Sequence, residues 1–530
     1  MRRTLRAEIA VLSAVLSLLA LLAPDARAQL TDQTQTPNPA GAGILKSFEQ
    51  EIGTGVGDVM TPGSSIFLIE RDPARAIQRG RQIFQRKFTV AQGFGPRTHD
   101  GSGDIAMDGS LGAGLVDSCA GCHARPRGSA GFGGDVFTRP DSRDAPHLFG
   151  LGLQEMLGDE ITADLRAIRA AAVAEATRRG VPVERALVSK GIRYGRIRAL
   201  ADGRIDTRGV EGVDPDLRVR PFFAHGGTIS IREFAVGAFK NEMGLQAVDP
   251  LLSTAAAGGR VVTPAGMVLD GALDKVEKPP AASASDDPDG DGVRNEIPTA
   301  IVDFMEFYLL NYFEPATYRQ TRSTRLGLAA FRVIGCDGCH VQNLTIEHDR
   351  RVATVETRYD RARGIFNNLF ATVTPQITES DDHSGFPTLK RPAGGRYVVE
   401  NLFADMKRHD LGPAFHERNF DGTLQTQFMT EPLWGVGTSA PYGHDGRSIN
   451  LREVILRHGG EAQSSRDGFA ALPESLKVAL VDFLESLVLF PPDDTASNLD
   501  PGDPSTPGFP QKGHGSIKLG VLFDDPSEGE

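Results

Sequence analysis

Apolar residues recur at helical spacing in two stretches of the chain, and each stretch is followed by a pair of cysteines. We expect one helix over residues 73–87, with Asp72 as its N-cap, and a second over residues 322–333. The apolar positions that define them are Ile77, Ile83 and Phe84 in the first helix and Leu326, Leu328 and Phe331 in the second. The chain therefore contains a weak internal repeat, in which the first copy carries a Gly- and Asp-rich insertion over residues 89–118.

The same periodicity predicts helices over residues 159–179, 231–243 and 473–488, and short strands such as 260–263. Ser230 is the expected N-cap of the 231–243 helix, and Gly244 is expected to end it. Residues 29–65 lack apolar periodicity and predict a loosely ordered arm, while residues 493–530 form a Pro-, Gly- and Asp-rich tail. Residues 278–289 turn to Pro, Ala, Ser and Asp, which places a predicted domain boundary at 285/286.

All four cysteines lie in two motifs of the form C-x-x-C-H, Cys119 to His123 and Cys336 to His340. In this motif two thiols form thioether links to haem and the adjacent imidazole coordinates the iron. The thiols are Cys119, Cys122, Cys336 and Cys339. We therefore expect two covalent c-type haems, with His123 and His340 as iron ligands. The alternative, redox dithiols or a zinc site, requires neither histidine.

These motifs set the predicted fold class. A helix followed by C-x-x-C-H is how cytochrome c domains begin, and the 473–488 helix ends the second unit as a cytochrome C-terminal helix would. We predict a mainly α protein of two cytochrome c-type haem domains with short β insertions. The haem 1 domain spans residues 66–285 and the haem 2 domain spans residues 286–492.

The first 28 residues predict export. Arginines at positions 2, 3 and 6 precede an apolar run over residues 9–23, and Ala26-Arg27-Ala28 follows. This is typical of a signal peptide cleaved after Ala28, although an uncleaved anchor is the alternative. Nothing later in the chain has the length and apolarity of a membrane span, so we expect a periplasmic protein without one. The net charge of −12 argues against nucleic-acid binding and permits a basic electron-donor protein as partner.

An acidic loop follows the predicted domain boundary. Asp287, Asp289 and Asp291 alternate with a proline and glycines. Carboxylates that converge from one bend suit Ca²⁺, but the EF-hand pattern fails because Pro298 stands at position twelve. A Ca²⁺ loop and a solvated acidic turn both remain open.

Residues 432–448, which include Trp434 and the Pro441-Tyr442-Gly443-His444-Asp445-Gly446 element, are followed by a helical pattern that starts at Leu451. This region resembles the second haem domain of bacterial di-haem cytochrome c peroxidases and of the related methylamine-utilisation enzyme. It is most similar to the di-haem oxidoreductase family, whose members are labelled peroxidases and sometimes thiol oxidoreductases. Residues 145–153, 241–244 and 287–292 agree with that family, and the resemblance spans roughly residues 70–490.

The resemblance implies roles for residues around haem 2. The eighth residue of the helix from Leu451 is an iron-ligating methionine in the peroxidases and a tyrosine in the methylamine enzyme, whereas here it is His458. We therefore expect His340 and His458 to ligate haem 2, at a lower potential than methionine would give. The alternative is that His458 only ends its helix, where a cation favours the dipole. Trp434 is expected to pack near haem 2, with electron transfer as a further role, and Arg447 to pair with a propionate.

At haem 1 the resemblance implies a more open iron. Residues 124–146 contain neither His nor Met, so we rank an open sixth position above ligation by His147 or His225. Gln154 and Glu155 follow in the same pocket segment, where Glu155 could move the proton that O–O cleavage needs, or could be an ordinary exposed carboxylate.

These inferences predict a periplasmic di-haem oxidoreductase in which haem 2 relays electrons and haem 1 activates hydrogen peroxide or another small oxidant. The alternatives are a non-enzymatic electron-transfer cytochrome and an oxygen-activating di-haem oxygenase.

Overall fold

The structure is a computed structural model. It describes residues 52–86, 88, 118–123, 135–136, 143–311, 321–352, 354–356, 374–376, 378–380, 388–390, 395–419 and 422–487. The predicted signal peptide over residues 1–28, the insertion over residues 89–117 and the tail over residues 493–530 lie outside these ranges.

The first repeat unit is built on a pair of crossed helices. Helix α4 (Pro73–Gln85) is capped by Asp72, whose side chain accepts a hydrogen bond from the Arg75 N–H, as the sequence predicted. It packs against α9 (Thr299–Asn311), and a Cβ on Gly80 would lie only 2.2 Å from the Phe304 carbonyl oxygen. Glycine at this point therefore lets the two backbones meet closely.

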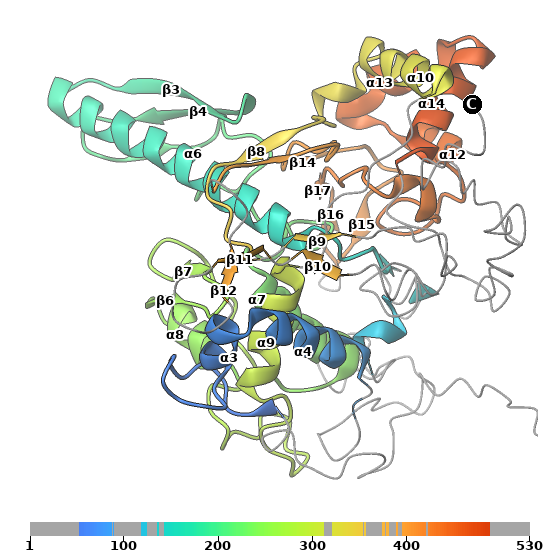
Figure 1. Ribbon diagram of the computed structural model, residues 1–530. Coiled ribbons are helices and arrows are strands. Elements are labelled where there is room, and N and C mark those ends of the chain that lie inside the picture. Colours follow the sequence, from blue (N-terminus) through green and yellow to red (C-terminus); the bar gives the residue numbers. More distant parts are fainter. Residues whose placement is uncertain are drawn as a thin grey trace, which may run out of the picture.

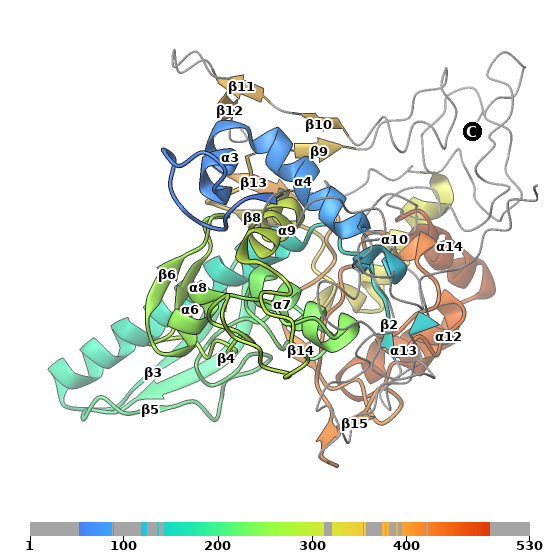
Figure 2. The same ribbon diagram turned by 90° about the horizontal axis from the view of Figure 1, so that it is seen from below.

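The second repeat unit also has a glycine where its two helices cross closely. Helix α10 (Arg322–Val333) begins with a capping box between Thr321 and Thr324 and packs against α14 (Glu474–Glu485). A Cβ on Gly327 would lie 2.0 Å from the Ala479 carbonyl oxygen. Helices α12 (Leu451–Arg457) and α13 (Gln463–Ala471) complete this unit, which lies apart from α4, α7 and α9 in both Figure 1 and Figure 2.

Two predictions of the domain limits need correction. Helix α9 packs on α4 of the first unit, so the boundary predicted at 285/286 separates it from its partner, and the packing favours a junction after Asn311. From residue 52 onward the predicted loose arm is part of the packed structure. The Val56 N–H, for example, donates to the Asp303 carboxylate at 2.6 Å.

A long helix and a small sheet extend from the first unit. Helix α6 (Leu151–Arg179) starts eight residues earlier than predicted, directly after Gly150 in the left-handed conformation. It packs against β3 (Val183–Ser189) and β4 (Ile192–Ala199) (Figure 1). These two strands pair with each other, and β4 also pairs with β5 (Ile205–Asp206), which gives one antiparallel sheet in the order β3-β4-β5.

The remaining elements of the first unit include α7, which matches its predicted limits. They are α3 (Ser65–Arg71), α7 (Ile231–Met243), α8 (Pro250–Ala256), β6 (Arg260–Val262) and β7 (Val268–Asp270). Ser230 caps α7 by accepting from the Glu233 N–H, and Gly244 ends it in the left-handed conformation. The predicted strand at 260–263 is confirmed as β6.

Short antiparallel strand pairs occupy the connecting segments. They are β1 (Asp135–Val136), β2 (Arg143–Asp144), β8 (Leu344–Ile346), β9 (Thr354–Glu356), β10 (Thr374–Gln376), β11 (Thr378–Ser380), β12 (Thr388–Lys390), β13 (Tyr397–Val399), β14 (Arg408–His409), β15 (Glu417–Arg418), β16 (Leu424–Gln425) and β17 (Phe428–Met429). Within the described residues, each of these sheets has only two strands, which agrees with a mainly α fold. The assignment of two cytochrome c domains remains a prediction.

The hydrophobic core has two parts. The larger part joins α4, α6, α7 and α9 and continues into the second unit through residues such as Leu344, Val399 and Trp434. The smaller part lies between α10 and α14 and centres on Phe331, Phe403 and Phe483. In the part of the chain that the structure describes, no helix combines the length and apolarity needed to cross a bilayer.

Candidate haem centres

The first C-x-x-C-H motif folds as one tight turn. Residues Cys119–Gly121 form a 3-10 turn, and the His123 N–H donates to the Cys119 carbonyl at 3.0 Å. The His123 Nδ1 lies 2.7 Å from the Pro146 carbonyl oxygen. A carbonyl only accepts, so Nδ1 carries the proton and the Nε2 lone pair is left for a metal.

The second motif repeats this geometry. Residues Cys336–Gly338 form the turn, and the His340 N–H donates to the Cys336 carbonyl at 3.0 Å. The His340 Nδ1 donates to the Phe403 carbonyl at 2.8 Å, which again directs the Nε2 lone pair elsewhere. An aromatic ring from the preceding helix lies beside each histidine, Phe84 at 6.4 Å from His123 and Phe331 at 6.0 Å from His340, between centroids.

Burial keeps the second motif's histidine neutral and the first cysteine of each motif protonated. Burial lowers the pKa of His340 to about 4, and the nearby His458 adds to this effect. Burial also raises the pKa of the Cys119 and Cys336 thiols to about 12. A reactive dithiol or a zinc site needs thiolates, so these environments disfavour both alternatives. None of the four cysteines, all of which are described, forms a disulfide.

His458 presents the same features as the two motif histidines. It follows α12, whose N-cap is Asn450, and its Nδ1 lies 2.7 Å from the Val454 carbonyl oxygen. Burial lowers its pKa, so the ring is neutral at neutral pH. A neutral imidazole gains little from a helix dipole, which argues against a merely helix-ending role. Its influence on the pKa of His340 indicates that the two rings are close.

The residues present therefore fit haem. Each of the three histidines has its Nδ1–H held by a backbone carbonyl, which is how proteins orient an imidazole toward a metal. Two buried ring nitrogens, His147 Nδ1 and Trp434 Nε1, have no hydrogen-bond partner among the described residues. A buried polar atom left unpaired costs about 1–3 kcal/mol, and a polar group of a bound cofactor would offset that cost.

The loop that supports His340 has an unusual backbone. Asn401, Phe403 and Met406 have φ values of 55°, 53° and 57°, in the left-handed region that side chains other than glycine rarely adopt. Such residues cost roughly 1–3 kcal/mol each and persist only where the surrounding structure holds them. Phe403 provides the carbonyl that fixes His340, so the strain lies at the point that orients the ligand.

The structure places Glu155 in the interior, only 1% exposed, so the interpretation of an exposed carboxylate is wrong. Its two oxygens accept from the Ile231 N–H and from the Arg350 guanidinium, both at 2.6 Å. Burial raises its pKa to about 7, against the lowering effect of Arg350. Gln154, its predicted companion, is half-buried.

His147, which follows the first motif, contacts Trp434, which follows the second. The His147 Nε2 lies 3.1 Å from the Trp434 carbonyl oxygen, and burial lowers the pKa of His147 to about 4. The Trp434 ring lies against Gly150, where a Cβ would come within 2.6 Å of it. Trp434 thus connects the start of α6 to the second unit. The residue before His147 is Pro146, whose carbonyl oxygen accepts from His123 Nδ1, so His147 is next in the chain to the group that orients His123.

The family element at 441–448 arranges its charged groups differently from the prediction. Arg447 is exposed, with 63% of its side chain accessible, and it lies 3.6 Å from Asp445. The buried guanidinium here belongs to Arg457, which donates to Asp445 at 2.8 Å and lies 4.2 Å from the Phe415 ring centroid. His444 lies 2.8 Å from the Glu417 carboxylate, which fixes the turn.

The acidic loop gathers its carboxylates as the sequence suggested. One oxygen from each of Asp287, Asp289 and Asp291 lies within 4.8 Å of the others. Asp287 also accepts from the N–H groups of Gly290 and Gly292, which stabilises the turn without an ion. The grouping is compatible with Ca²⁺ and with a solvated turn alike.

A second cluster was missed from the sequence. Ligand atoms of Cys339, Asp405 and His409 lie within 4.8 Å of one another beside the second motif. Both ring nitrogens of His409 already bond to carboxylates, Nε2 to Asp405 at 2.8 Å and Nδ1 to Glu461 at 2.7 Å. The imidazole therefore offers no lone pair to a metal. Nothing in the local sequence signals this contact, because Glu461 is 52 residues away.

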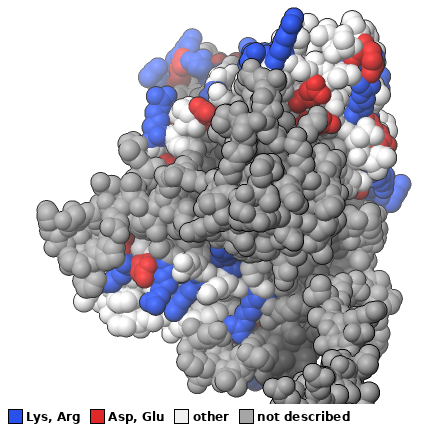
Figure 3. Space-filling model, turned by 45° about the vertical axis from the view of Figure 1, so that its right-hand side comes forward, with Lys and Arg blue, Asp and Glu red and all other residues white. Residues whose placement is uncertain are grey.

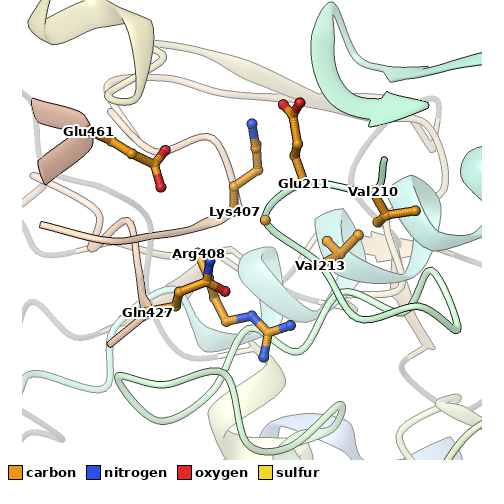
Figure 4. A pocket seen from close by; sticks show the side chains of 8 residues that line it. Val210, Glu211, Val213, Lys407, Arg408, Gln427 and Glu461 are labelled. Carbon is orange, nitrogen blue, oxygen red and sulfur yellow. The ribbon is translucent and has the colours of Figure 1, made fainter. Parts of the chain in front are cut away.

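A polar cavity of about 320 Å³ borders Glu461, the hydrogen-bond partner of His409 (Figure 4). The loop over residues 210–213 lines one wall, and Lys407, Arg408, Gln427 and Glu461 line the other. Its lining is charged, whereas a haem pocket is largely apolar, so we do not assign it to a haem.

Comparison with known proteins gives one family match. No match was found among curated proteins. Residues 323–487, which contain the second C-x-x-C-H motif, Trp434 and His458, match the model of the DHOR family. Over this segment the family resemblance predicted from the sequence is confirmed, and the matching family is described as "Di-haem oxidoreductase, putative peroxidase".

Proposed function

We propose that this protein is a periplasmic di-haem c-type oxidoreductase that reduces hydrogen peroxide or another small oxidant. The observation that carries the proposal is the common orientation of His123, His340 and His458, each with Nδ1 bound to a backbone carbonyl. The thiols of both motifs would attach the two haems. When bound, the haems supply irons that carry single electrons and, at an open sixth position, take up a small oxidant.

His340 and His458 support an electron-transfer role for the second centre. Both imidazoles are half-buried, burial lowers the pKa of each, and the effect of His458 on the pKa of His340 indicates proximity. Two imidazoles give a saturated, low-spin iron at a lower potential than a histidine and methionine pair. Trp434, which packs against Gly150 of the first unit, is positioned to conduct between the two units.

Glu155 supports proton transfer in the first unit. Its pKa of about 7 lets the carboxyl both hold and release a proton near neutral pH, as a general acid requires. The Ile231 N–H and Arg350 fix its two oxygens, so its direction is set by α7 and by the second unit. The half-buried Gln154 is proposed to assist it in the same segment.

Location and partners follow from the sequence. Export to the periplasm would bring the chain to the compartment where c-type haem is attached, and a small electron-carrier protein would supply electrons. On the face shown in Figure 3, basic and acidic side chains are interspersed over the described residues. A partner that docks on this face would meet both signs of charge, and the net charge of −12 favours a basic one.

The test is the electron paramagnetic resonance spectrum of the oxidised protein, followed by a peroxide titration of the reduced protein. The proposal predicts one low-spin and one high-spin centre, and electron consumption by peroxide. Glu155→Gln should slow turnover by about 10²-fold or more, the usual contribution of a general acid. Glu160→Gln, on the same helix but paired with Lys190, should not.

Two low-spin centres that ignore peroxide would contradict the proposal and favour an electron-carrier cytochrome. Reaction of the reduced protein with oxygen but not with peroxide would instead favour an oxygenase.

A further inference from the structure

His409 lies between two carboxylates that belong to different segments. Its Nε2 is 2.8 Å from Asp405 Oδ2, and its Nδ1 is 2.7 Å from Glu461 Oε2. An ionised carboxylate only accepts hydrogen bonds, so both ring nitrogens must donate and the ring is an imidazolium. His409 is 7% exposed and Asp405 is 1% exposed, which shields this charge-assisted contact from water.

One end of this bridge lies in the loop that orients His340. Asp405 is two residues from Phe403, whose carbonyl accepts the His340 Nδ1–H. This loop carries the left-handed residues Phe403 and Met406, so it needs external contacts to hold its shape. The hydrogen bond from His409, which lies in β14, to Asp405 is such a contact.

The other end lies in the turn that begins at His458. Glu461 is three residues beyond His458, and its Oε1 accepts from the Asp410 N–H at 3.0 Å. The Glu461 N–H in turn donates to the Asp410 carbonyl at 2.9 Å. His409 and its neighbour Asp410 therefore bind the turn at three points.

The bridge thus joins the support of one imidazole to the segment that carries the other. Cys339 lies within 4.8 Å of Asp405 and His409, so the contact is also adjacent to a haem-attachment position. The outer face of Glu461 borders the charged cavity of Figure 4, whereas the rest of the bridge is interior. The proton transfer proposed for Glu155 does not involve this bridge.

We propose that His409 is a positioning residue, which fixes His340 and His458 relative to one another through Asp405 and Glu461. The inference rests on the proposed function, because it requires an iron held by these two imidazoles. Its consequence is a single ligand geometry at the second centre and hence a single potential for the electrons that pass through it.

The test compares variants of the full-length holoprotein. Wild type should show one low-spin signal for the second centre and one midpoint potential. His409→Gln removes the positive charge and replaces two donor nitrogens on opposite sides of a ring by one amide nitrogen and an acceptor oxygen, so the signal should split or lose intensity to a high-spin component, and the potential should shift. Glu461→Ala removes the hydrogen bonds of the Glu461 carboxylate to His409 Nδ1 and to the Asp410 N–H, keeps the His409–Asp405 pair, and should change the same signal.

His416→Gln is the matched control. His416 lies seven residues along the same segment and pairs with Asp410 at 2.7 Å, but it does not join Asp405 to Glu461. It should leave the spectrum and potential of the second centre unchanged. Haem content, measured by pyridine haemochrome, should be two per chain in every variant.

The outcomes separate the two proposals. A wild-type second centre without a bis-imidazole low-spin signal would overturn the proposed ligation itself. A wild-type signal that is present, and unchanged in both His409→Gln and Glu461→Ala, would overturn the positioning role even if thermal stability fell. An equal change in His416→Gln would also overturn it, because the effect would then be a general disturbance of the segment.

Discussion

Gly327→Ala should destabilise the second unit, although alanine is the better helix former. Gly327 lies inside α10 where that helix crosses α14, and its added Cβ would be 2.0 Å from the Ala479 carbonyl oxygen and 2.7 Å from Phe483 Cβ. Ordinary contact begins near 3.4 Å, so the helices would have to separate by about 1.4 Å. The obstacle is backbone, which cannot rotate away as a side chain can.

The magnitude follows from two opposing terms. Alanine gains about 1 kcal/mol over glycine in a helix interior. Overpacking a closed interface costs about 1–3 kcal/mol, and more where backbone must move. We therefore expect a net loss of about 2 kcal/mol in the free energy of unfolding, or roughly 4–8 °C in Tm for a unit of this size.

Thermal unfolding, followed by the haem absorbance and by circular dichroism, measures this effect. Gly237→Ala provides the control, because Gly237 lies inside α7 and its added Cβ would meet only the Phe223 ring at 4.0 Å. That variant should gain stability from helix propensity alone. A Gly327→Ala protein that melts at or above the wild-type temperature would refute the close crossing of α10 and α14.

Four further predictions concern the centres and their charges. Cys336→Ala should retain at most one covalent haem, measured by the mass of the denatured protein; retention of two would contradict the attachment role. His458→Ala should convert the second centre from low spin to high spin, and an unchanged spectrum would remove His458 from the ligand set. The pKa of Glu155, about 7 against an ordinary 4.5, means that its proton favours the folded state, so its contribution to stability is present at low pH and falls as pH rises from 4.5 through 7. Glu155→Gln should flatten that part of the stability profile in denaturant titrations. Burial lowers the pKa of His409, but the Asp405 carboxylate and the Cys339 thiol outweigh it and raise the pKa above the ordinary 6.5, so its stabilisation is full below pH 6.5 and falls progressively as pH rises from 6.5 through the raised folded pKa. The stability difference between wild type and His409→Gln should therefore be constant below about pH 6 and shrink steadily as pH rises above 6.5.

Local sequence patterns were sufficient to predict the helices whose ends carry recognisable capping residues. Asp72 with Pro73, and Ser230 with Gly244, mark caps that depend only on neighbouring residues, and the structure uses each as predicted. The C-x-x-C-H segments likewise form the same short 3-10 turn in both copies. The identification of His458 came from family resemblance, and its burial beside His340 agrees with that role.

Helix α9 shows where the periodicity method fails. All of its residues from Ala300 to Asn311 are buried, so its sequence is apolar on every side and carries no amphipathic stripe. Without that stripe no helix was predicted there, and the domain boundary was placed before it. Its true partner, α4, is more than 200 residues away in sequence, and only the packing reveals the pair.

The site residues that the sequence misplaced or missed depend on long-range contacts. Glu155 is buried because Arg350 and the start of α7 close over it, which a local pattern cannot express. The sequence does not distinguish Arg447 from Arg457. In the structure Arg447 is exposed, whereas the Arg457 guanidinium packs over the Phe415 ring. His409 meets Glu461 across the second unit, so neither residue signals the other.

The central claim is that two haems are covalently attached through the two C-x-x-C-H motifs. Mass spectrometry of the exported, denatured protein tests it most directly. The account predicts a polypeptide heavier by two haems, with the added mass on the peptides that contain Cys119 and Cys336. A mass equal to that of the bare chain would contradict it.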